Sequence, residues 1–171
     1  GTDAIEGRIA RDMDVIRDAA LEAVGEESLR ALILGGGYGR GEGGVYVVDG
    51  EERVYNDYDL FVVVPFTSRK RRNWVSSQLA GVKAAVEPGC GIHVDFGPPM
   101  PESDLASQPY ELMFMELKAG HHVLHGPEQI LDGLPEYDES SPPLDEGARL
   151  FMNRGVGLLM AEMLLREGRE L

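Results

Sequence analysis

The sequence is poor in several residue types, and each shortage excludes a class of protein. Its 171 residues contain one cysteine, Cys90, which excludes an intramolecular disulfide framework and favours a reducing compartment. No apolar run reaches the ~20 residues that a membrane-spanning helix needs, and the N-terminus has no apolar signal-peptide segment. We therefore expect a cytoplasmic protein with no membrane partner. Cys90 is expected to be a small buried apolar residue rather than a nucleophile.

Positive charge is also scarce. Lys and Arg number 16 against 30 Asp and Glu, which gives a formal net charge of -14. Binding to long nucleic acid depends on cationic side chains that displace counterions from phosphates, so that class of partner is disfavoured. The one basic cluster, "RKRRN" at 69–73, predicts the solvated start of a helix rather than a nucleic-acid patch.

The hydrophobic periodicity predicts an α/β (α+β) fold, with a small mixed sheet flanked by helices. Ile5, Ile9, Met13, Ile16 and Ala20 recur at helical spacing before Gly25. The other predicted elements follow in order: a strand at 29–34, a hairpin of 45–48 and 52–55 around a turn at 49–50, a strand at 59–65, a helix from a Thr67 or Ser68 cap to Pro88 and Gly89, a strand at 91–97, a loop at 100–109, and a helix at 110–120 from a Ser107 cap to Gly120.

The C-terminal part of the chain differs from the rest. Residues 135–147 are rich in proline and acids, as in a connector between subdomains, so we divide the chain into units at 1–134 and 135–171. Residues 150–165 predict a helix that is apolar on nearly all sides. Such a helix needs partners around it, which a homodimer, a partner protein or a longer natural chain would supply.

A glycine-rich loop follows the first predicted strand. Seven of the ten residues at 35–44 are glycine, far more than a packed element requires. Such a loop offers backbone N–H groups to phosphate oxygens, and Arg40 adds a planar fork that a phosphate can accept twice.

Three carboxylates are placed where they could serve that loop. Asp57 and Asp59 are two residues apart at the entry to a strand, so both side chains leave the same face. Asp95 lies on another strand, on the face opposite its apolar residues. If the strands are neighbours, the three charges repel unless a cation lies between them, and oxygen ligands of this kind suit Mg²⁺ or Mn²⁺. Loop, arginine and acids together indicate metal-assisted phosphoryl or nucleotidyl transfer.

Simpler interpretations exist for each motif. Asp57 and Asp59 alone could form a turn and cap, and Asp95 alone could be a solvated strand residue. Gly39, Gly41 and Gly44 satisfy G-x-G-x-x-G, but they lead into a predicted strand and turn, whereas the dinucleotide-binding motif opens a helix. The histidines of "HHVLH" (121–125) fall on a predicted strand edge and are expected to be solvated or hydrogen-bonded rather than zinc ligands.

The motifs taken together resemble those of the DNA polymerase beta-like nucleotidyltransferase superfamily. "GGYGRGE" (36–42), "NDYDLFVVV" (56–64) and "HVDF" (93–96) match its glycine turn, its D-x-[D/E] strand and its later single carboxylate. The loop wording is most similar to the uridylyltransferase that modifies the PII protein. The short chain and "LKAGHHVLHGPEQIL" (117–131) resemble minimal and aminoglycoside nucleotidyltransferases.

This resemblance implies roles for particular residues. Asp57 and Asp59 would bind Mg²⁺ (or Mn²⁺), and Asp95 would bind one metal and help to deprotonate the acceptor hydroxyl. Gly36 and Gly37 would hold the triphosphate through the backbone, with Arg40 nearby. Two features depart from the family: Gly37 stands where many members carry Ser, and the interval from Gly37 to Asp57 is lengthened by the predicted hairpin.

The implied activity is transfer of NMP from an NTP such as ATP to a hydroxyl, with release of pyrophosphate. The acidity of the chain favours a small cationic metabolite or a protein side chain as acceptor. Two other functions stay open: an antitoxin-like regulatory protein that binds a partner through the 150–165 helix, and a non-catalytic nucleotide-binding module.

Overall fold

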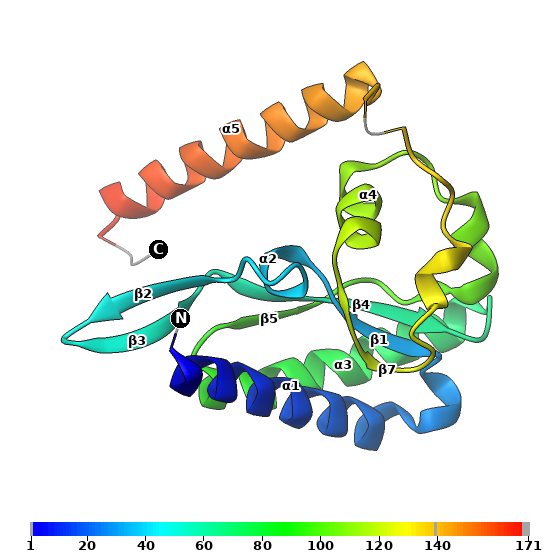
Figure 1. The fold of residues 1–171 in the computed structure, drawn as a ribbon, viewed down its shortest axis with the longest axis horizontal. Coiled ribbons are helices and arrows are strands. Elements are labelled where there is room, and N and C mark those ends of the chain that lie inside the picture. The colour runs from blue at the N-terminus through cyan, green and yellow to red at the C-terminus, as the bar shows by residue number, and fades with distance from the viewer. Residues whose placement is uncertain (1, 139, 169–171) are drawn as a thin grey trace.

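A mixed five-stranded sheet lies at the centre of the computed structural model, which describes residues 2–138 and 140–168 (Figure 1). The helices are α1 (Asp3–Val24), α2 (Gly36–Gly39), α3 (Arg69–Cys90), α4 (Leu112–Ala119) and α5 (Leu144–Arg166). The 3-10 helices are η1 (Glu26–Ser28), η2 (Glu102–Ser107) and η3 (Ile130–Gly133). The strands are β1 (Ala31–Leu34), β2 (Gly44–Val48), β3 (Glu51–Tyr55), β4 (Asp57–Val64), β5 (His93–Phe96), β6 (Met100–Pro101) and β7 (His122–His125).

The sheet is mixed because it contains both antiparallel and parallel strand pairs. The strand order is β5-β4-β1-β7, and β6 also pairs with β4. β1 runs antiparallel to both β4 and β7, whereas β4 runs parallel to β5 and β6. The helix α3 makes the crossover between β4 and β5 that a parallel pair requires. The predicted fold class is therefore confirmed.

One face of the sheet is covered by α1 and α3, which lie side by side beneath it (Figure 1). The predicted apolar stripes of both helices point into this core, where Ile16, Val75 and Leu79 are almost wholly buried. Tyr58 on β4 is also fully buried, and its hydroxyl donates to Asp12 Oδ2 of α1 at 3.0 Å. This hydrogen bond satisfies the polar atom that burial of a tyrosine would otherwise leave unpaired.

The other face carries a smaller apolar cluster. α4, η2 and η3 pack over β1 and the C-terminal part of β4 through a separate set of side chains. The buried members of this cluster are Ala31, Ile33, Val63, Leu105, Phe114, Leu117, Val123, Ile130, Leu131 and Leu134. The N-terminal part of β4, with Asp57 and Asp59, and Asp95 near the C-terminal end of β5 remain outside this cluster.

The predicted hairpin is present as β2 and β3, a separate two-stranded sheet. Asp49 and Gly50 both have positive φ, 55° and 82°, as the favoured two-residue hairpin turns require. The Tyr38 hydroxyl donates to Gly44 O at 2.8 Å and accepts from Tyr55 N at 3.0 Å. Tyr38 therefore fixes the base of the hairpin to the glycine-rich loop.

The predicted end of α3 was wrong. The helix continues through Pro88 and Gly89 and ends at Cys90, followed by the cap residue Gly91 with a left-handed φ of 66°. The last turn is retained because Val86 and Cys90 pack into the core. Burial raises the pKa of the Cys90 thiol to about 11, so this cysteine is an apolar packing residue as predicted. The basic residues at 69–72 form the first turn, where residues 69–71 are exposed and Arg72 is partly buried, and Ser68 caps it.

Two element boundaries after β5 were also mispredicted. The expected loop at 100–109 contains β6 and η2, and α4 begins after Glu111 with no Ser107 cap. Instead, the Ser107 hydroxyl donates to Asp104 O at 3.0 Å within η2. None of the described helices is long and apolar enough to span a bilayer.

The last helix, α5, begins at Leu144, earlier than the predicted start at 150, and contacts the body mainly at its first turns. Its buried Glu146 accepts a hydrogen bond from Leu112 N at 3.1 Å, and Arg149 pairs with Glu111 at 3.2 Å. Beyond these contacts the helix stands away from the sheet (Figure 1). The division of the chain at 134/135 stays a prediction, and residues 139 and 169–171 of the second unit lie outside the described residues.

Candidate active site

The three predicted carboxylates share the face of the sheet that α1 and α3 do not cover. β4 begins at Asp57, and its register with the parallel strand β5 places Asp59 opposite Asp95. Tyr58 and Leu60 point to the α1 and α3 side, so Asp57 and Asp59 point to the other. On β5, Val94 is buried in that core and Asp95 is exposed on the opposite side.

Asp59 is partly buried, whereas Asp95 is exposed. Burial raises the pKa of the Asp59 carboxyl above the usual value, and the charges of Asp57 and Asp95 raise it further. The Arg40 guanidinium acts in the opposite direction but is the smallest of the four influences. Negative charge at this position is therefore under-compensated by the protein, which is the condition that a bound cation would relieve.

The glycine turn touches Asp59 directly. Gly36 has a left-handed φ of 58°, and a Cβ at this residue would lie 2.2 Å from Asp59 Oδ2. Gly35 N also donates to Asp59 O at 2.8 Å, so the loop follows β4 closely. The single helical turn α2 starts here, and the first N–H groups of a helix have no acceptor inside it. Gly36 thus lies beside Asp59, and Gly37 follows it in the same helical turn.

Arg40 is engaged by acidic side chains rather than directed toward open solvent. Its Nε lies 3.1 Å from Glu42 Oε2, and a terminal nitrogen lies 3.2 Å from Glu116 Oε2. Glu116 comes from α4, far away in the sequence, and the sequence analysis did not identify it. The pairing holds the guanidinium between two exposed carboxylates and near enough to Asp59 to lower the pKa of that carboxyl.

Asp95 also has a cationic partner that the sequence analysis missed. Lys83 Nζ of α3 donates to Asp95 Oδ1 at 2.8 Å, and this contact raises the pKa of the lysine. Lys83 follows Val82 of the predicted apolar stripe, and nothing in the sequence marks it as a site residue. Asp57 accepts a hydrogen bond from the Asn56 side chain, and Asn56 has a left-handed φ of 80° that asparagine tolerates.

The carboxylate oxygens of the three aspartates are chemically suited to a hard divalent cation, although the side chains do not converge on one point. Among the described residues, no three His, Cys, Asp or Glu side chains lie close enough to hold a metal ion as they stand. Asp95 is held by Lys83, and its side chain is 65% exposed, so rotation toward Asp59 meets little steric resistance. Carboxylate oxygens on adjacent strands are the ligands that Mg²⁺ and Mn²⁺ take together with phosphate and water.

The histidines at 121–125 are placed as predicted, on the edge strand β7 and the residue before it. His121 Nδ1 lies 2.9 Å from Leu117 O, and His125 Nε2 lies 3.2 Å from Leu29 O. Hydrogen bonds to backbone carbonyls account for both rings.

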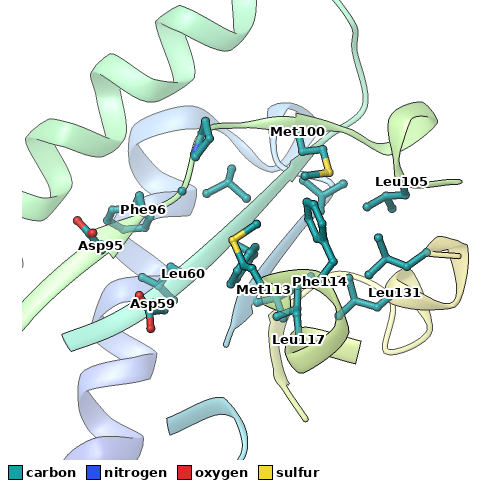
Figure 2. A pocket seen from close by; sticks show the side chains of 17 residues that line it. Asp59, Leu60, Asp95, Phe96, Met100, Leu105, Met113, Phe114, Leu117 and Leu131 are labelled. Atoms are coloured by element: carbon teal, nitrogen blue, oxygen red, sulfur yellow. The ribbon is translucent and has the colours of Figure 1, made fainter. Parts of the chain in front are cut away.

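A cavity of about 290 Å³ opens beside two of the acids. Figure 2 shows Asp59 and Asp95 at one end and apolar side chains of α4, η2 and η3 toward the other. Its lining residues are Ile33, Asp59, Leu60, Phe61, Val62, Val63, Asp95, Phe96, Gly97, Pro98, Met100, Leu105, Met113, Phe114, Leu117, Leu131 and Leu134. Sequence reasoning did not find this cavity, because it depends on where α4 settles over the sheet.

Comparison with solved structures identifies the fold. The chain is similar to the crystal structure of spectinomycin adenyltransferase AAD(9) from Enterococcus faecialis with ATP and spectinomycin, with a TM-score of 0.54 over 87% of this chain at 10% identity. The match covers 66% of the adenyltransferase chain, just under two thirds. The predicted nucleotidyltransferase-like fold is thereby confirmed. No protein-family model matches the sequence, and the curated proteins give no significant match.

Two further structures are more distant. One is the crystal structure of a toxin-antitoxin with AMP-PNP, and the other is that of the toxin-antitoxin MntA-HepT. Their TM-scores are 0.38 and 0.36 at 10% and 9% identity, over 88% and 90% of this chain and 96% and 97% of theirs. Similarity at this level does not define a shared fold.

Proposed function

We propose that this protein is a metal-dependent nucleotidyltransferase that moves NMP from an NTP to a hydroxyl of an acceptor. The observation that carries the proposal is the contact between the glycine turn and the acids: Gly36 lies against Asp59, and Asp59 pairs in register with Asp95. A glycine-rich turn and a carboxylate pair thus lie within one small area of the sheet, which supports binding of a phosphate and a cation together. The adenyltransferase fold of the chain agrees with this chemistry.

The residues have distinct tasks in this proposal. Backbone N–H groups of Gly36 and Gly37 bind the triphosphate, and Arg40 exchanges its carboxylate partners for a phosphate. Asp57, Asp59 and Asp95 would hold Mg²⁺ or Mn²⁺, which would neutralise phosphate charge and lower the pKa of the acceptor hydroxyl. Asp95 Oδ2, the carboxylate oxygen not bonded to Lys83, accepts the hydroxyl proton. The acceptor oxygen then bonds to the α-phosphorus as the bond to pyrophosphate breaks.

Substitution of Asp59 tests the proposal. Asp59→Asn keeps the size of the side chain but removes a charge, so pyrophosphate release should fall by about 10²-fold or more. The matched control is Asp12→Asn, the same substitution at an aspartate on the covered face that contacts Tyr58. The control should keep its rate. Near-normal turnover in Asp59→Asn, measured with several NTPs, would refute the assignment.

A further inference from the structure

The cavity beside Asp59 and Asp95 has an unusual division of chemistry. Apart from these two carboxylates, its described lining consists of apolar side chains and Gly97. Ile33, Phe61 and Val63 of the sheet form one wall, and Phe114 and Leu117 of α4 form the opposite wall. Polar groups at one end of an otherwise apolar cavity orient a ligand that has both characters.

One end of the cavity is bordered by Asp59 and Asp95, the residues to which the proposed function assigns the reacting hydroxyl. Asp95 and Phe96 are consecutive on β5, and both line it, so the carboxylate borders the apolar space (Figure 2). Gly97 continues the same wall, and its N–H donates to Leu60 O at 2.8 Å. A molecule seated among the apolar side chains would therefore meet charged side chains at Asp59 and Asp95.

We propose that this cavity binds the acceptor, and that the acceptor is a small alcohol with an apolar body of one or two rings. The inference rests on the proposed function, which it deepens by naming the substrate class. The volume of about 290 Å³ exceeds the ~150 Å³ of an engineered apolar cavity that takes benzene, so a bicyclic body fits. Among the described lining residues, only the two acids have side chains that could hydrogen-bond a polyol.

This substrate class differs from the cationic metabolite that the net charge favoured. Net charge describes the whole surface, whereas the acceptor is selected by the side chains that it touches. The hydroxyl would sit at the acidic end, where Asp95 takes its proton, the oxygen bonds to the α-phosphorus and pyrophosphate leaves. The apolar body would stay between the sheet and α4, and its burial would exclude water from the attacking oxygen.

Titration calorimetry with 2-naphthol, without nucleotide, tests the cavity independently of catalysis. We expect saturable binding with a Kd of about 0.1–1 mM and a negative heat-capacity change. Met113 lines the cavity from α4 and is 44% exposed, so Met113→Trp should obstruct the opening without disturbing the core. Met113→Leu should keep binding, and so should Val15→Trp, a control at an exposed position on α1. Absence of saturable binding, or equal binding by Met113→Trp, would overturn the proposal.

A second variant guards against misfolding of Met113→Trp. Leu131→Ala enlarges the far end of the cavity and should increase affinity for a larger bicyclic alcohol relative to 2-naphthol. An unchanged preference would count against the assignment.

Pyrophosphate release separates this inference from the proposed function. Apolar alcohols should be adenylylated or otherwise nucleotidylated in preference to a polyol such as myo-inositol, and Met113→Trp should raise their KM. Transfer to polar acceptors that is insensitive to Met113→Trp would overturn the cavity proposal and leave the transferase intact. Binding of 2-naphthol without transfer to any acceptor would support the cavity and refute the transferase.

Discussion

The two faces of the central sheet are built differently. α1 and α3 cover one face from end to end, and the core beneath them contains residues such as Ile16 and Leu79 with at most 1% exposure. On the other face, α4 and the 3-10 helices cover only one end of the sheet. The acids, the glycine turn and the cavity all lie on this second face.

This contrast indicates that one face of the sheet mainly stabilises the fold, whereas the other carries the candidate active site. The covered face buries apolar area continuously, which is the main favourable term in folding. The open face instead concentrates like charges around Asp59, whose carboxyl pKa is raised by burial and by its acidic neighbours. Functional sites commonly keep such unfavourable arrangements at a cost in stability that the rest of the fold offsets.

The largest expected effect comes from truncating side chains on each face. Ile16→Ala removes a fully buried side chain between α1 and the sheet, so the free energy of unfolding should fall by about 2–5 kcal/mol. Met113→Ala, at a partly exposed position on the open face, should cost less than about 1 kcal/mol. Urea unfolding of both variants measures the difference. Similar losses would show that the open face is as important to stability as the covered one.

A pair of glycine substitutions sharpens the comparison at backbone level. Gly36→Ala requires an L residue at φ 58° with its Cβ against Asp59, so we expect a loss of about 1–3 kcal/mol and of transferase activity. Gly81 lies in the exposed surface of α3 with nothing within 4 Å of an added Cβ. Gly81→Ala should therefore stabilise the protein by about 0.5–1 kcal/mol. Thermal melts and pyrophosphate release measure both; a neutral Gly36→Ala would contradict the close contact.

Periodicity predicted the covered face well because each element there is determined by its own pattern. The stripes of α1 and α3 and the apolar run of β4 specify which side is buried without knowledge of their partners. The Asp49-Gly50 pair likewise specifies its turn through local backbone preferences. Local signals failed where packing overrides them, as at Pro88, where α3 continues because Cys90 is buried.

The candidate site was predictable in its acids but not in their partners. The D-x-D spacing at 57 and 59 fixed a common face, and alternation in β5 placed Asp95 on one side of its strand. The ion pairs of Lys83 with Asp95 and of Glu116 with Arg40 join side chains from different elements, 12 and 76 positions apart in the sequence. Their existence depends on helix placement and side-chain rotation, for which a single sequence contains no local pattern.

The pH dependence of stability gives a smaller effect that still distinguishes the faces. The carboxyl pKa of Asp59 is raised in the folded state, so the folded protein binds this proton more tightly than the unfolded chain. Its contribution to the free energy of unfolding therefore falls as pH rises from the unfolded value of 3.8 through the raised pKa, and stays low above it. In buffer with EDTA, Asp59→Asn should be more stable than wild type by about 1 kcal/mol at pH 7.

A divalent cation separates this effect from a similar one on the covered face. The pKa of Asp12 is also raised, chiefly by burial, with the hydrogen bond from Tyr58 opposing the shift. Added Mg²⁺ or Mn²⁺ should stabilise wild type and Asp12→Asn but not Asp59→Asn, because Asp59 pairs in register with Asp95 on the open face. Thermal shifts across a cation titration measure this. Equal stabilisation of all three proteins would place the cation elsewhere.

The smallest effect on folding is expected in α5, whose large apolar side chains are the most exposed in the comparison of covered and open surfaces. Phe151, Leu158 and Met163 are all more than half exposed, so replacing them with glutamate should change the free energy of unfolding by less than about 0.5 kcal/mol. Exposed apolar area of this kind marks association surfaces. We therefore predict that the unmodified protein self-associates or binds a partner protein through α5, and that Phe151→Glu with Leu158→Glu abolishes this. Light scattering of both proteins, alone and with a candidate partner, measures the change, and Val15→Glu on α1 serves as the control. If the wild-type protein is monomeric and binds none of the partners tested, the prediction is wrong. A large loss of stability in the double variant would show that α5 packs against its own chain instead.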